Sequence, residues 1–328
     1  MTVRPTSTGS IPSVLETRFP PGGALAGRVF DRLVGDIDDE APMPVGSRIG
    51  CWRLGALLGC GGSAMVYRAE RADGEFEQHV ALKVVRAGRV LIDRFRRERQ
   101  ILAGLRHASI ARLIDGGRLD DGRLWLAMEL VAGERIDDWV RVRRASVEER
   151  LLLFEAVCEA VAYAHERGLV HRDIKPGNLL VDENGRPHLI DFGIATATAG
   201  DEDGALAMTP IYASPEQRSG APITAASDIY QLGSLLRRLI APDGSACRTL
   251  PVTPQDVIAN ADAIAVQATA NDPAQRFVSV ASLGFAVATL RVRARVAVLR
   301  DARARLAERF GLGAKLGELV QRSRAFVA

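Results

Sequence analysis

Three side chains of different chemical types lie within eight residues in the segment HRDIKPGN, residues 171–178. Asp173 is a carboxylate that can orient a hydroxyl group and accept its proton, and Lys175 is a cation that can neutralise phosphate. Asn178 supplies an amide oxygen that can hold a metal ion, and Asp191 in DFG, residues 191–193, offers a second metal-binding carboxylate. This set of groups is suited to moving a phosphoryl group onto a hydroxyl.

A glycine-rich segment, LGCGGSAMV at residues 58–66, lies upstream between two predicted strands. Glycine lets a backbone lie close over phosphates and present its amide groups to them. Hairpins also use glycine simply to turn the chain. The segment alone therefore leaves phosphate binding and an ordinary hairpin equally open.

The lysine of VALK, residues 80–83, lies in an apolar strand from which it could reach the α and β phosphates of a nucleotide. An ammonium group is costly to bury unless an opposite charge is close, and Glu98 on the following helical segment is the natural partner of Lys83. The alternative is an edge-strand lysine and a solvated glutamate among the many charges of residues 94–99. Taken in isolation, the two residues favour this alternative.

The elements that would position these groups follow from the hydrophobic pattern. Short apolar runs broken by glycine predict strands at 52–58, 64–69, 80–85, near 113 and at 124–129, with a helix at 91–105. This is a five-stranded antiparallel sheet with one helix. Later helices are predicted at 147–167, 225–240, 254–270 and 278–290, and two short strands bracket the turn signal Asn184-Gly185, the second ending at Asp191.

Taken in order, these motifs resemble those of the eukaryotic-like bacterial serine/threonine protein kinases, over residues 49–290. The motifs are the glycine-rich loop, VALK, Glu98, HRDIKPGN, DFG, SPE at 214–216 and Asp228. The resemblance implies an α+β, bilobal protein kinase fold, with a small antiparallel N-lobe sheet plus one helix and a larger, mainly α-helical C-lobe. It gives an N-lobe (47–131) and a C-lobe (132–290). Composition adds a flexible leader (1–46), rich in Pro, Gly, Ser and Thr, and a basic amphipathic C-terminal helix or tail (291–328).

The resemblance also implies a role for each motif residue. Asp173 would be the catalytic base, Lys175 would stabilise charge on the transferred group, and Lys83 would pair with Glu98. Asn178 and Asp191 would hold Mg2+, with Mn2+ as an alternative metal. ATP would contact the following residues: Leu58, Gly59, Gly61, Gly62, Val66, Ala81, Lys83, Glu129, Val131, Asn178 and Asp191.

Further residues are expected to support this site by the same resemblance. Met128 would be the gatekeeper beside adenine, and Asp228 would anchor the His171 region from the helix beneath. The expected apolar stack and the expected buried ion pair consist of Leu102, His171 and Phe192, and of Glu216 and Arg276. Only 35 residues separate Ile240 from Arg276, so the helix that commonly docks protein substrates is expected to be short or absent.

The activity implied is transfer of the γ-phosphoryl group of ATP to serine or threonine hydroxyls of protein substrates. Lys175 favours these acceptors over tyrosine. Autophosphorylation is expected at Thr196 or Thr198, with Arg172 receiving the phosphate. A homodimer that serves this autophosphorylation is a further expectation.

Two alternatives come from other classes of protein. A nucleotide-binding pseudokinase or scaffold usually lacks one of Lys83, Asp173 or Asp191, and all three are present. A small-molecule kinase of related fold shares the Asp and Asn spacing but usually lacks the SPE segment and Lys175.

Composition sets the remaining limits. The chain has 328 residues, of which 47% are hydrophobic, enough to bury the core of one large domain or two lobes. No apolar run reaches the roughly 18 residues of a membrane span, and the N-terminus does not resemble a secretory signal, so the cytoplasm is the expected compartment. Four scattered cysteines suggest neither zinc nor disulfides, and a net charge of +3 is too small to imply nucleic acid.

The C-terminal tail concentrates positive charge. From Arg291 onwards there are ten Lys or Arg and three acidic residues, so the tail carries about +7 and the remainder about −4. Apolar residues at 292, 296, 299, 306 and 310 form a helical stripe with arginines on the other faces. Packing on the large lobe, self-association, and contact with an anionic membrane or acidic partner all fit this pattern.

Overall fold

The computed structural model describes residues 42–61, 64–85, 92–192, 211–241 and 254–309. The chain divides into two compact units, Met1–Met43 and Pro44–Ala328, and every helix and strand given below belongs to the second. Gly62, Thr196 and Thr198 lie outside the described residues, as do most of the predicted leader and the end of the tail.

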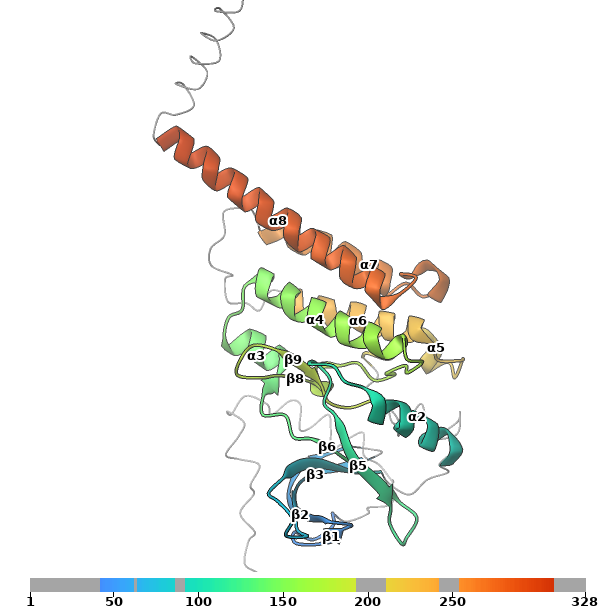
Figure 1. Cartoon of the computed structure of the whole chain (residues 1–328). Coiled ribbons are helices and arrows are strands. Elements are labelled where there is room, and N and C mark those ends of the chain that lie inside the picture. Colours follow the sequence, from blue (N-terminus) through green and yellow to red (C-terminus); the bar gives the residue numbers. More distant parts are fainter. Residues whose placement is uncertain (1–41, 62–63, 86–91, 193–210, 242–253, 310–328) are drawn as a thin grey trace, which may run out of the picture. The chain divides into compact units, whose positions relative to one another are not determined.

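An antiparallel sheet of six strands precedes the helical part of the second unit (Figure 1). Its order is β1-β2-β3-β4-β6-β5. The strands are β1 (Arg48–Ile49), β2 (Trp52–Cys60), β3 (Ala64–Arg71), β4 (His79–Val85), β5 (Leu113–Arg118) and β6 (Leu124–Glu129). The five predicted strands are confirmed, and β1 is an addition because two residues are too few to show a period.

The helix α2 (Ile92–Gly104) follows β4, as predicted. The later elements include a second, three-stranded sheet formed by β7 (Glu134–Arg135), β8 (Leu179–Val181) and β9 (Pro187–Leu189). Gly185 turns the chain between β8 and β9 with a φ of 78°, a conformation that favours glycine. The hairpin is confirmed, but its second strand ends at Leu189 rather than at Asp191.

Helices dominate the rest of the described chain. They are α3 (Ile136–Val142), α4 (Val147–His165), α5 (Pro215–Arg218), α6 (Ala225–Ile240), α7 (Pro254–Ala268) and α8 (Val280–Arg309), with the short 3-10 helices η1 (Pro176–Asn178) and η3 (Pro273–Gln275). Ser146 and Glu149 form a capping box that fixes the start of α4. This helix leads towards the segment 171–178, as the pattern predicted.

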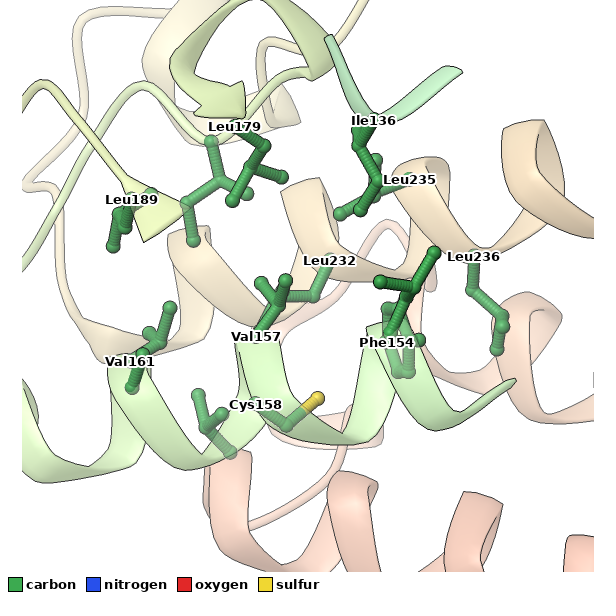
Figure 2. Close-up of a cluster of buried hydrophobic side chains, with 14 of the residues drawn as sticks. Ile136, Phe154, Val157, Cys158, Val161, Leu179, Leu189, Leu232, Leu235 and Leu236 are labelled. Carbon is green, nitrogen blue, oxygen red and sulfur yellow. The ribbon is translucent and has the colours of Figure 1, made fainter. Parts of the chain in front are cut away.

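The core of the helical part surrounds α4. Phe154, Val157 and Val161 of α4 are buried with Leu232 of α6 and Leu189 of β9 (Figure 2). Helix α8 packs along another side of α4. Because neighbours cover α4 on several sides, its buried residues are not confined to one stripe.

Helix α8 is longer than the helix predicted at 278–290. It continues without interruption to Arg309, through the predicted boundary between the C-lobe and the tail. No glycine or proline occurs between residues 291 and 309, so nothing in the local sequence ends the helix. None of the described helices is both long enough and apolar enough to cross a membrane.

Candidate active site

The loop that carries Asp173 is fixed to α6 by a buried carboxylate. Asp228 is fully buried, and its two oxygens accept the backbone N–H groups of His171 and Arg172, each at 2.7 Å. Arg172 has a φ of 69°, which is rare for a residue with a side chain. The surrounding hydrogen bonds therefore hold the loop in a conformation that it would not favour in isolation.

Two glutamines that the sequence reading missed complete this anchor. The side-chain amides of Gln217 and Gln231 both donate to the carbonyl oxygen of Arg172, at 2.7 and 2.8 Å. The oxygen of Gln231 accepts the backbone N–H of Ile174 at 2.7 Å. Gln231 could have been found because it lies three residues after Asp228 and so on the same side of the helix.

Asp173, Lys175 and Asn178 meet as the sequence predicted. The Lys175 ammonium lies 2.8 Å from Asp173 Oδ2. Asn178 Nδ2 donates to the same oxygen at 2.9 Å and to the Asp173 carbonyl at 2.7 Å. Because the nitrogen of the Asn178 amide is used in this way, its oxygen remains available as the kind of ligand that Mg2+ prefers.

Asp191 is brought beside this group by the backbone. The N–H of Ile190 donates to the carbonyl oxygen of Asn178 at 3.1 Å, which places the two predicted metal ligands on adjacent segments. A carboxylate and an amide oxygen fit a hard divalent cation, and phosphate oxygens and water would complete the coordination.

The expected pairing of Lys83 with Glu98 is not what the structure contains. Lys83 Nζ lies 2.7 Å from both carboxylate oxygens of Asp191, and Glu98 instead pairs with Arg172 at 2.8 Å. Each of these two cations is buried, and a buried charge needs an opposite one. The sequence supplied all four groups but could not determine which cation each carboxylate would take.

One face of the N-lobe sheet collects the residues expected to contact the nucleotide. The strand register places Val66 opposite Lys83 and Ala81 opposite Met128. Residues two apart on a strand point to the same face, so Ala81 and Lys83 share it, and directly opposite partners share it too. The backbone of Glu129 follows Met128 directly at the end of β6.

The glycine-rich loop leaves room over this face. Among the described residues, a side chain added at Gly59 would meet no atom within 4 Å, and one at Gly61 would meet the Ala64 carbonyl at 3.8 Å. The described part of the loop thus carries no side chain that would crowd a phosphate at Gly59. The Gly61 N–H donates to Ala64 O at 2.9 Å, so this amide is already used in the loop itself.

His171 and Phe192 support the loop from its apolar side. Their rings lie 4.7 Å apart, and Leu102 is buried in the same core. Burial lowers the pKa of His171, which favours the neutral ring, and its Nδ1 accepts the backbone N–H of Asp173 at 3.2 Å. Two of the three predicted stack residues, His171 and Phe192, are thus in ring contact beside the Asp173 loop.

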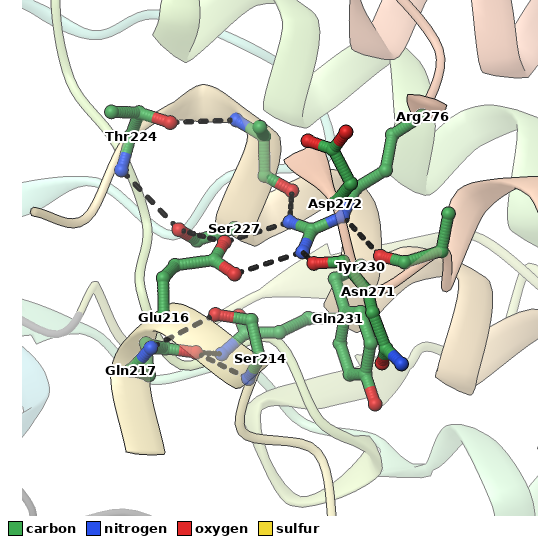
Figure 3. Close-up of polar contacts among 12 residues, drawn as sticks. Ser214, Glu216, Gln217, Thr224, Ser227, Tyr230, Gln231, Asn271, Asp272 and Arg276 are labelled. Carbon is green, nitrogen blue, oxygen red and sulfur yellow. Dashed lines mark hydrogen bonds and ion pairs between the residues drawn. The ribbon is translucent and has the colours of Figure 1, made fainter. Parts of the chain in front are cut away.

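Glu216 and Arg276 form the predicted buried ion pair (Figure 3). Two parallel contacts of 2.7 and 2.8 Å join them, and Ser227 donates to the same carboxylate at 2.7 Å. Burial by itself raises the pKa of Glu216, but the hydrogen bonds from Arg276 and Ser227 outweigh it and lower that pKa to about 2. The pair ties α5 to the segment after α7.

The family of this chain follows from a comparison with known protein families. Residues 52–275, more than half of the chain, match the model of the protein kinase domain. The chain belongs to the protein kinase family. The fold of this kinase domain is the α+β, bilobal fold that the resemblance implied.

Similar proteins include several bacterial kinases. The serine/threonine-protein kinase PrkC of Bacillus subtilis is 35% identical over 264 residues, which are 72% of this chain and 40% of PrkC. PknJ of Mycobacterium tuberculosis is 33% identical over 276 residues, 75% of this chain and 46% of PknJ. PknA of the same species is 33% identical over 267 residues, 74% of this chain and 62% of PknA. The chain thus spans less than half the length of PrkC and PknJ.

Proposed function

We propose that this kinase domain transfers the γ-phosphoryl group of ATP to serine or threonine hydroxyls of protein substrates. The observation that supports the proposal is an unbroken line of contacts: Lys83 to Asp191, the Asp191 segment to Asn178, and Asn178 to Asp173, which also holds Lys175. The relatives named serine/threonine-protein kinases point to the same activity. No observation favours a pseudokinase.

In the proposed reaction, the Asp173 carboxylate orients the acceptor hydroxyl and takes up its proton as the new bond to phosphorus forms. Lys175, held 2.8 Å from that carboxylate, stabilises the negative charge of the group in transit. Mg2+, bound by Asn178 and Asp191, would neutralise the phosphates of ATP. The requirement for Mg2+ rather than Mn2+ is tested by comparing rates with each metal.

The proposed reaction requires two ion pairs to change partners. Lys83 must leave Asp191 if it is to contact phosphates while Asp191 binds the metal, and Glu98 is then its proposed partner. Glu98 would have to leave Arg172, which is buried and would need another anion. We propose that a phosphate on Thr196 or Thr198 provides this anion.

The test is phosphosite mapping of the full chain after incubation with ATP and Mg2+, beside the Asp173→Asn variant. The native chain should gain phosphate on serine or threonine, with Thr196 or Thr198 among the sites. Asp173→Asn should bind ATP equally well and lose roughly 10^2- to 10^4-fold in phosphorylation rate. Nucleotide binding without phosphate transfer to the chain itself or to a general protein substrate would contradict the proposal and support a scaffold.

The cytoplasm is the proposed compartment, and fractionation of cells producing the chain would test this. A homodimer and contact of the basic tail with an anionic surface are separate proposals, and α8 bears on both.

A further inference from the structure

Helix α8 carries two lines of apolar residues on opposite sides. Val280, Leu283 and Val287 are buried against the C-lobe. Phe285, Val292 and Val296 are 74%, 52% and 59% exposed. At about 100° per residue, the exposed line falls on the side of the helix facing away from the first. A helix that only covers the lobe needs one apolar line, so the second calls for a partner.

Contacts with α4 fix which side of α8 faces outward. Arg291 binds Glu155 through two contacts of 2.7 and 2.9 Å, and Arg295 lies 3.6 Å from Glu148. Moving forward along α8 therefore means moving backward along α4, so the two helices are antiparallel. From Arg295 to Arg309, α8 runs on past the first turn of α4 (Figure 1).

The beginning of the outward face is acidic. A shallow hollow of about 260 Å3 lies between α4 and α8, lined by Glu155, Glu159, Ala281, Gly284, Phe285 and Ala288. Glu159 is exposed there, whereas Glu155 is bound to Arg291. An arriving cation would thus find a carboxylate beside Phe285, the first large exposed apolar residue of α8.

The other end of the same helix is basic. Residues 297–309 contain four arginines and two acidic residues, and Arg303 is exposed. The spacing of Val292 and Val296 continues in the sequence to positions 299, 303 and 306, in steps that alternate between four and three residues. Positions 299 and 306 carry leucine, and position 303 carries arginine. Among the side chains that the structure describes, the outward line is apolar at Phe285, Val292 and Val296, with Glu159 beside its start and Arg303 towards its end.

We propose that this face binds the same face of a second copy of the chain, with the two α8 helices antiparallel and Val292 at the two-fold axis. In this register Phe285 of each copy lies at the level of position 299 of the other. Position 281 lies opposite position 303, so Arg303 of one copy reaches the hollow that holds Glu159 of the other. A two-fold interface needs such a self-complementary surface.

An anionic membrane fits this face less well than a second copy does. Arg303 would be attracted to such a surface, but Glu159, beside Phe285, would be repelled by it. A second copy satisfies both ends of the face together. The proposed dimer interface contains no residue of the candidate active site, so it is separate from the proposed function.

The register makes a charge-exchange experiment possible. In the Asp173→Asn background, sedimentation of the full chain should show a dimer that weakens as salt is raised. Glu159→Arg alone and Arg303→Glu alone should each be mainly monomeric, because each places like charges together twice per dimer. An equal mixture of the two variants should form a dimer, since both contacts then join opposite charges.

Matched variants keep the experiment decisive. Glu183→Arg makes the same charge change on the exposed β8–β9 turn and should leave the dimer intact. Val292→Glu should give a monomer with an unchanged melting temperature, since this side chain is already half exposed. A native chain that is monomeric throughout, or a mixture no more dimeric than its components, would overturn the proposal. A monomer that binds phosphatidylserine vesicles through α8 would replace it with the membrane surface.

Discussion

Arg172 shows how single residues hold the catalytic loop in a form that its local sequence disfavours. Its backbone N–H binds Asp228, and its carbonyl accepts hydrogen bonds from both Gln217 and Gln231. Its positive φ is thus supported from both sides of the residue. The proposed role of Asp173 as the catalytic base would depend on its position to within a fraction of an ångström, so these supports should matter for the phosphorylation rate.

Replacing Gln231 by methionine should therefore separate rate from binding. The variant keeps the approximate volume but loses the hydrogen bonds to Arg172, Ile174 and Gln217. The phosphorylation rate should fall roughly 10- to 100-fold, while the dissociation constant of ATP should stay the same. Steady-state kinetics measure the phosphorylation rate, and nucleotide titration measures the dissociation constant of ATP. Equal losses in both would show that Gln231 supports the fold in general.

Glu216 should make the stability of the domain depend on pH in acid. Its pKa is about 2 in the folded protein, below the ordinary value of 4.5, so its contribution is complete above pH 4.5 and is lost as the pH falls towards 2. As the pH is lowered, the free energy of unfolding should therefore fall more steeply in the native chain than in Glu216→Gln. The extra loss in the native chain should total up to about 3 kcal/mol. Urea unfolding at several pH values measures this. Parallel curves for the two proteins would contradict the assignment.

At the scale of elements, the crossing of α6 and α7 depends on one glycine. A side chain at Gly233 would lie 2.7 Å from Ala268 Cβ, 2.9 Å from Thr269 Cγ2 and 3.2 Å from the carbonyl of Ala265. The carbonyl belongs to a helix backbone and cannot turn aside. The small residue therefore sets how closely the two helices approach.

Gly233→Ala should push these helices apart and destabilise the domain by about 1–3 kcal/mol. Thermal unfolding should show a melting temperature lower by several degrees. Gly104→Ala is the matched control, because a side chain there would meet no atom of the described residues within 4 Å and alanine favours a helix. If the two variants had the same melting temperature, the close approach at Gly233 would not limit the packing of α6 and α7.

At the scale of the whole molecule, the active site joins residues from both lobes. Lys83 comes from the N-lobe sheet and Asp191 from the segment after β9, yet their charged groups lie 2.7 Å apart. A ligand that contacts both should stabilise the fold, by about 2.7 kcal/mol at a concentration 100 times its dissociation constant. Binding there would couple the two lobes.

ATP with Mg2+ should raise the melting temperature more than ATP with a chelator, because in the proposed site Asn178 and Asp191 would hold the metal that neutralises the phosphates. Asp191→Asn should remove most of this metal-dependent difference, whereas Glu183→Gln, on an exposed turn, should retain it. Differential scanning fluorimetry measures all three proteins. A metal effect that survives in Asp191→Asn would place the metal elsewhere.

The sequence by itself determined the family, the five main strands of the N-lobe, the order of the helices and the set of charged groups at the site. These follow from local signals: hydrophobic period, turn residues, and the motif spacing of HRDIKPGN and DFG. The start of α4 at Val147 and the two ends of α6, for example, were predicted correctly because caps and periodicity are properties of neighbouring residues.

The tertiary structure alone decided how the charged groups pair and which surfaces remain exposed. Lys83 takes Asp191 and Glu98 takes Arg172, although the motif pattern predicts Lys83 with Glu98. Electrostatic pairing depends on distances between segments far apart in sequence, and local sequence does not fix those distances. The exposed face of α8 was also decided by tertiary structure. The sequence shows apolar residues at a helical period, but only the packing of α8 against α4 reveals which of them are left uncovered.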